Sequence, residues 1–149
     1  MLFANRGEVM LPRIEAFSSV LTGISLRAVS RLSQQYADLH RVLSARSAVE
    51  QQAAVERLVA TALDANSLTA ADVSAPGEFE RLDERAWLVQ EQVKRGSATQ
   101  EQYEAAFRRA RAASAVQSLA RPQAALEDAA YEAVHALPAD VDARPIISG

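Results

Sequence analysis

The sequence predicts an all-α fold, a single-domain helical bundle of about five helices with a long first helix and no sheet. Three observations support this. The chain has 149 residues, a usual size for one domain. Apolar residues recur at steps of three and four over most of its length. Alanine, which has the highest intrinsic helix propensity, occurs 31 times.

The periodic pattern sets the expected domain organisation. Residues 1–11 show no periodicity and are expected to form an N-terminal arm, and residues 12–138 the bundle. Residues 139–149 contain a proline and an isolated Ile146–Ile147 pair, so we expect an extended or disordered C-terminal tail.

The first two helices are predicted over residues 12–45 and from Ser47 to about Asn66. A stripe of apolar residues runs along the first: Ile14, Phe17, Leu21, Ile24, Ala28, Leu32, Tyr36, Leu39 and Leu43. Ser47 and Glu50 have the spacing of a capping box, which favours a new helix at this point. One continuous helix bent near Arg46 is the alternative. The predicted buried side of the second helix comprises Val55, Leu58, Val59, Ala62 and Leu63.

Three further helices are predicted after the second. Residues 69–72 fit one short turn between the second helix and the third. The third is predicted from about Pro76 to Arg95, with Gly96 as its stop. Thr99 and Gln102 form a second capping-box pattern that opens the fourth helix. The fifth helix restarts at Arg121–Pro122 and ends at Pro138. The predicted inward residues are Phe79, Leu82, Ala86, Val89 and Val93 in the third, Tyr103, Ala106, Phe107, Ala110 and Ala113 in the fourth, and Leu126, Ala129, Ala130, Ala133 and Leu137 in the fifth.

Composition argues against several classes of protein. The formal net charge of −3 and pI of about 5.4 disfavour a nucleic-acid binder. Without cysteine there is no disulfide framework, thiolate nucleophile or Cys-ligated zinc site. No apolar run is long enough for a membrane span, so we expect a cytoplasmic protein without a cofactor. Because alanine buries little area per residue, the core is thin, and we expect a homo-oligomer, most simply a dimer.

Trp87 and Leu88 are the candidate interface residues. Both fall outside the apolar stripe of the third predicted helix, so that helix presents apolar bulk on two sides. Either the helix is central within the chain, or a partner covers its second side. Tryptophan is enriched at interface hot spots, which makes this face a candidate contact surface.

Two groups of polar residues are candidate anion sites. Arg31 and Gln35 interrupt the apolar stripe of the first helix one turn apart and could clamp a carboxylate or phosphate. The alternative is an arginine that packs its stem and keeps its head in water. Arg108, Arg109 and Arg111 form the densest basic patch and are expected to fan across the outward half of the fourth helix. We expect them to pair with the acidic third or fifth helix rather than with phosphate.

Glu132 and His135 have the Glu-x-x-His spacing found in di-iron helical bundles. The only other histidine, His40, has no carboxylate at the matching position, so no metal site is predicted. His135 is also expected to lie away from the core.

These observations favour a non-catalytic helical interaction or assembly module that self-associates or docks another protein. The alternative is a small helical enzyme or an anionic-ligand-binding domain that uses Arg31 and Gln35. A DNA-binding regulator is a third hypothesis, disfavoured by the negative charge.

Overall fold

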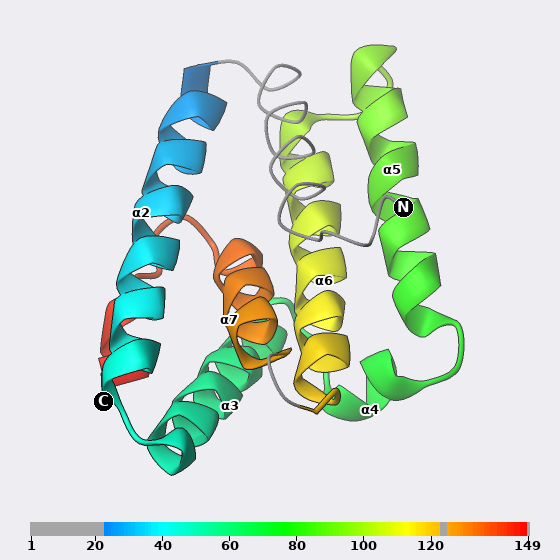
Figure 1. Cartoon of the computed structure of the whole chain (residues 1–149). Helices are drawn as coiled ribbons and strands as arrows, with labels where there is room; N and C mark the ends of the chain where they lie inside the picture. The colour runs from blue at the N-terminus through cyan, green and yellow to red at the C-terminus, as the bar shows by residue number, and fades with distance from the viewer. Residues whose placement is uncertain (1–22, 123–124, 149) are drawn as a thin grey trace, which may run out of the picture. The chain divides into compact units, whose positions relative to one another are not determined.

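The computed structural model describes residues 23–122 and 125–148, and the side chains of residues 33–122 and 125–147. Within these ranges the chain is all-α, with no strand (Figure 1). The helices of these ranges are α2 (Gly23–Ala45), α3 (Ala48–Ala65), α4 (Ala70–Ser74), α5 (Glu78–Lys94), α6 (Gln100–Leu119), α7 (Ala125–Ala136) and α8 (Arg144–Ser148).

The described helices differ in two respects from the five that were predicted. α4 forms where only a short turn was expected. α8 forms in the tail that was predicted to be extended or disordered, and its Ile147 is buried. The predicted start of the first helix near residue 12 lies outside the described residues.

The chain divides after Gln34 into two units. The second unit, Gln35–Gly149, holds α3 to α8 and the C-terminal part of α2, and every contact below lies within it. Of the first unit, the structure describes Gly23–Gln34, which form the first half of α2.

Side-chain caps set several helix boundaries. α2 and α3 are separate helices, because Ser47 caps α3 by accepting a hydrogen bond from the Glu50 N–H at 3.3 Å. Glu50 does not complete the predicted box; its carboxylate lies 3.7 Å from Nε of Arg46. The box at α6 is complete: Thr99 Oγ1 accepts from the Gln102 N–H at 3.1 Å, and the Gln102 side chain accepts from the Thr99 N–H at 2.8 Å.

Gly96 ends α5 as predicted, in the left-handed region at φ 79°. Its N–H donates to Val93 O and that of Ser97 to Gln92 O, which satisfies two carbonyls of the last turn. We expect Gly96→Ala to lower the free energy of unfolding by about 1 kcal/mol, because a Cβ disfavours this backbone conformation. Nothing lies within 4 Å of the added Cβ, so no clash adds to this loss. Urea unfolding measures it; Gly96→Asn, which tolerates positive φ, should lose less, and an equal loss in both would contradict this explanation.

The core is centred on α7, which packs against α6 and α3 (Figure 1). Eight of the twelve residues of α7 are buried, against four of seventeen in α5. α5 packs mainly on α6, with α4 near its N-terminal end, and therefore lies at the edge of the described helices of this unit. Among the described helices of this unit, α7 rather than α5 is therefore the central one.

Most of the predicted core residues are buried. All five of those predicted in α3 are buried, as are Leu82, Ala86 and Val89 of α5. Six others are half-buried instead: Tyr36, Phe79, Val93, Ala106, Phe107 and Leu126. Across the described ranges, no helix has the length and apolar character needed to cross a membrane.

Candidate functional site

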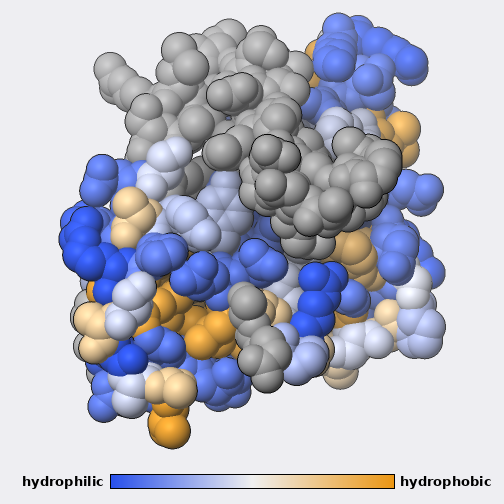
Figure 2. Space-filling model, viewed as in Figure 1, coloured by the Kyte–Doolittle hydropathy of each residue, from blue (hydrophilic) through white to orange (hydrophobic). Residues whose placement is uncertain are grey.

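The predicted interface residues lie on the solvent side of α5. Trp87 is 44% exposed and Leu88 51% exposed, both large values for apolar side chains. On the opposite side of the helix, Leu82, Ala86 and Val89 are buried towards α6. The face of the bundle in Figure 2 is mostly hydrophilic, and hydrophobic residues show at separate places on it, including along α5.

The predicted anion pair on α2 is placed only in part. Gln35 is buried. In the segment before α8, bonds from the backbone N–H and side chain of Arg144 hold the pKa of the Asp142 carboxyl below its usual range. Arg31 lies on α2, but its side chain is outside the described ones, so the predicted clamp stays a prediction.

The three arginines of the predicted basic patch do not share one solvent-exposed face. Arg111 is 3% exposed, so its expected position on the outward half of the helix is wrong. Arg109 donates to the backbone oxygen of Asn66 at 2.7 Å and so ties α6 to the end of α3. Arg108 is half-buried. The residues on both sides of Arg111 are small and buried, so neighbouring helices pack closely around this part of α6. The Arg111 side chain is buried for this reason.

Arg111 joins three helices through two carboxylates. Its Nη1 lies 3.1 Å from Oε1 of Glu132 on α7, and its Nη2 lies 2.9 Å from Oδ1 of Asp83 on α5. The Arg111 and Glu132 side chains are almost fully buried, whereas that of Asp83 is 29% exposed. A planar guanidinium with several fixed donors suits such a double contact. The expected pairing of the basic helix with the third and fifth predicted helices thus occurs inside the core.

A row of aromatic rings runs beside this ion cluster. The Arg111 guanidinium lies 5.3 Å from the centre of the Phe107 ring, within the range of a cation–π contact. From there the ring centres follow at 6.4 Å (Phe107–His135), 4.3 Å (His135–Tyr131) and 4.5 Å (Tyr131–Tyr36), and Tyr103 lies 6.0 Å from Phe107 on the other side. Burial raises the pKa values of Tyr36 and Tyr131 above the usual range, so both stay neutral.

His135 is buried at the centre of this row, contrary to the prediction that it lies away from the core. Its Nδ1 donates to the backbone oxygen of Tyr131 at 3.0 Å, and its Nε2 has no hydrogen-bond partner among the described residues. Burial, reinforced by the Arg111 charge, lowers the pKa of His135 to about 4, although the bond to Tyr131 opposes this. The imidazole is therefore neutral at pH 7.

The Glu132 and His135 side chains are both engaged in other contacts. Glu132 binds Arg111, and Nδ1 of His135 binds the helix backbone. Within the described part of the chain, no three His, Asp or Glu side chains gather as metal ligands. Because the Arg111 guanidinium already contacts two carboxylates, an anionic ligand would have to displace one of them. The chemistry of this cluster is that of a structural crosslink between α5, α6 and α7.

An exposed His40 lies between two polar side chains, a contact that sequence reasoning missed. Its Nε2 is 3.2 Å from Oε2 of Glu127, and its Nδ1 is 3.4 Å from Oγ of Ser44. The order resembles a nucleophile, a base and an orienting carboxylate. The Ser44 hydroxyl, however, donates a hydrogen bond to the His40 backbone oxygen at 2.8 Å. The imidazole therefore does not activate Ser44.

Comparison with known proteins adds no relative: no family model matches the chain, and no curated protein or solved structure matches it either.

Proposed function

We propose that this chain is a non-catalytic helical assembly module that self-associates through the outer face of α5. The observation that carries the proposal is the exposure of Trp87 and Leu88 on a helix at the edge of the described bundle. A tryptophan and a leucine lose favourable burial when they stay in water, and tryptophan is over-represented among residues that dominate binding energy.

The charges around Leu88 support a second copy as the partner. Arg85 and Glu91 lie three residues before and after Leu88, and both are exposed. If two α5 helices meet antiparallel on a two-fold axis at Leu88, each Arg85 faces the Glu91 of the other chain. Arg81 and Arg95, seven residues away, would also face each other. At a common helix crossing angle of about 50°, however, the two helices have separated by that distance.

The other two hypotheses receive less support. The ligand-binding alternative requires Arg31 beside Gln35, and the Gln35 side chain is buried. The DNA-binding hypothesis requires a continuous basic face, yet Arg111 is buried and Arg109 is bound to Asn66. Phosphate contact usually comes from several arginines or lysines on one accessible surface.

Charge reversal on α5 tests the proposed two-fold pairing. Arg85→Glu or Glu91→Arg alone places like charges together at two symmetric positions, so we expect the dimer dissociation constant to rise about tenfold. The Arg85→Glu/Glu91→Arg double variant restores opposite charges and should return it towards the wild-type value. Sedimentation equilibrium measures all three, with exposed Arg121→Glu as a control that should change nothing. Two neutral single variants, or no recovery in the double variant, would contradict the pairing.

A further inference from the structure

The short helix α8 is held on the bundle much as a bound peptide would be. It has five residues, too few to form a stable helix alone. It packs on α3, with Ile147 1% exposed and Ala143 fully buried. The surface of α3 therefore supplies the apolar contact that keeps this segment helical.

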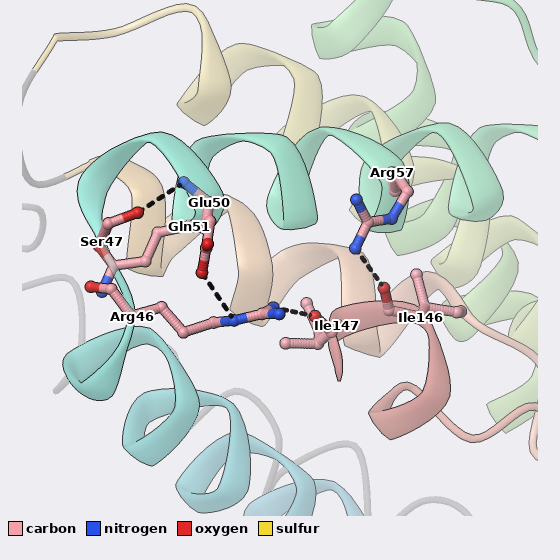
Figure 3. Close-up of polar contacts among 7 residues, drawn as sticks. All are labelled: Arg46, Ser47, Glu50, Gln51, Arg57, Ile146 and Ile147. Carbon is pink, nitrogen blue, oxygen red and sulfur yellow. Dashed lines mark hydrogen bonds and ion pairs between the residues drawn. The ribbon is translucent and has the colours of Figure 1, made fainter. Parts of the chain in front are cut away.

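Two arginines hold the end of α8 by its backbone (Figure 3). Nη1 of Arg46 donates to the backbone oxygen of Ile147, and Nη2 of Arg57 donates to that of Ile146 at 3.2 Å. The last carbonyls of a helix have no partner within it, and cationic side chains satisfy them well. Arg46 comes from the junction of α2 and α3, and Arg57 from α3 itself, so the two donors frame one site along α3.

Side-chain contacts hold the N-terminal end of α8. Asp142 Oδ1 accepts from the Arg144 N–H at 2.9 Å, and an Arg144 guanidinium nitrogen lies 3.7 Å from Oδ2 of Asp38 on α2. The site thus contacts the main chain of the last residues of α8, buries the Ile147 side chain beside them, and contacts Arg144 at the beginning of the helix.

The connection between this segment and the core is short and mostly exposed. After α7 the chain turns at Pro138, where the Val141 N–H donates to the Pro138 backbone oxygen at 3.0 Å. Ala139, Asp140 and Asp142 are exposed. Residues 138–143 span up to roughly 20 Å when extended, which is enough to reach an adjacent molecule.

We propose that α8 is exchangeable, and that the site framed by Arg46 and Arg57 accepts residues 139–148 of a second copy of this chain. The contacts are the same whether the segment belongs to the same molecule or to another, because no bonded geometry enters them. Within one molecule the segment competes at an effective concentration in about the millimolar range, so exchange in the wild type is infrequent. Removing this competition should reveal the intermolecular contact.

Complementation between two full-length variants tests this proposal. In the receiver, Ile147→Asp releases its own segment and leaves the site on α3 open. In the donor, Arg46→Gln/Arg57→Gln removes the site and leaves its segment free to bind elsewhere. The sequence has no cysteine, so Gly149→Cys on the donor and exposed Ala60→Cys on the receiver take single dyes. Energy transfer between the dyes reports binding of the segment to α3 of the other molecule.

We expect energy transfer in the mixture that saturates with receiver concentration. Adding Arg46→Gln/Arg57→Gln to the receiver should weaken it at least about tenfold, because two charged hydrogen bonds are lost. Arg121→Gln, which alters an exposed arginine beyond the end of α6, should leave it unchanged. No saturable transfer between folded variants, or equal transfer to the receiver without the two arginines, would overturn the proposal.

Two further measurements keep this test clear. Thermal unfolding of each variant establishes that the bundle has formed, and if Ile147→Asp does not fold, Ile147→Ser serves as the receiver. Pairing through α5 would also bring the two dyes close together, so both molecules carry Trp87→Ala in this experiment. Saturable transfer that remains in this background, and that the two arginine substitutions in the receiver weaken, reports exchange of α8, so failure of the α5 proposal and failure of this one are distinguishable.

Discussion

Arg111→Met is expected to lower the free energy of unfolding by about 3–5 kcal/mol, a large fraction of the stability of a domain of this size. The substitution keeps an unbranched side chain between α5, α6 and α7 but removes the cation that Glu132 and Asp83 share. Glu132 is 2% exposed, so its carboxylate would stay in the core without that partner. Urea unfolding followed by circular dichroism measures the loss.

Matched variants separate this effect from the general loss of an ion pair. Arg81→Met removes an exposed arginine that pairs with Glu78 at 2.8 Å, and it should cost less than about 1 kcal/mol. Adding Glu132→Gln to Arg111→Met should recover part of the loss, since a neutral amide is less costly to bury than a carboxylate. If Arg111→Met and Arg81→Met lose the same amount, the cluster does not hold the three helices together.

Acid should destabilise the protein through His135. The pKa of this imidazole is about 4 in the fold and 6.5 in an unfolded chain, so between these values the unfolded state binds the proton and the folded state does not. The free energy of unfolding therefore falls as the pH falls from 6.5 to 4. The contribution of His135 to this fall is about 3 kcal/mol by the usual conversion of pKa into free energy.

His135→Phe tests this directly, because it keeps an aromatic ring beside Tyr131 and Phe107 and removes the titration. Its free energy of unfolding should decline less between pH 6.5 and 4 than that of the wild type. An unchanged pH dependence in His135→Phe would show that His135 is not a neutral, buried group in the fold.

The local pattern of the sequence was sufficient for the helices and much of the core. The stripe in α3, the stop of α5 at Gly96 and the start of α6 at Thr99 were predictable, because periodicity and capping act within a few residues. The positions of Arg111 and His135 were not, since a single apolar stripe assumes one buried side per helix. α6 and α7 are buried on more than one side, and the small residues around Arg111 and on all sides of α7 are the signal that could have indicated this.

The helix α8 and the position of α5 also depend on contacts between residues that are distant along the chain. Residues 144–148 have no helical signal of their own, and Arg46 and Arg57 stabilise them from far earlier in the sequence. Trp87 and Leu88 were correctly placed outside the inward stripe of their helix. Local periodicity does not show which helix of a fold is the most buried. It therefore could not predict that α7, and not α5, is the central helix of the described part.

The mass in solution, measured by light scattering over a range of concentrations, tests the assembly proposal most directly. For the wild type we predict a mass that rises towards twice the 16.1 kDa of one chain. For Trp87→Ala and Leu88→Glu we predict the mass of one chain at the same concentrations, with unchanged helix content. A wild type that stays monomeric throughout, or variants that assemble as well as the wild type, would contradict the proposal that the outer face of α5 is an assembly surface.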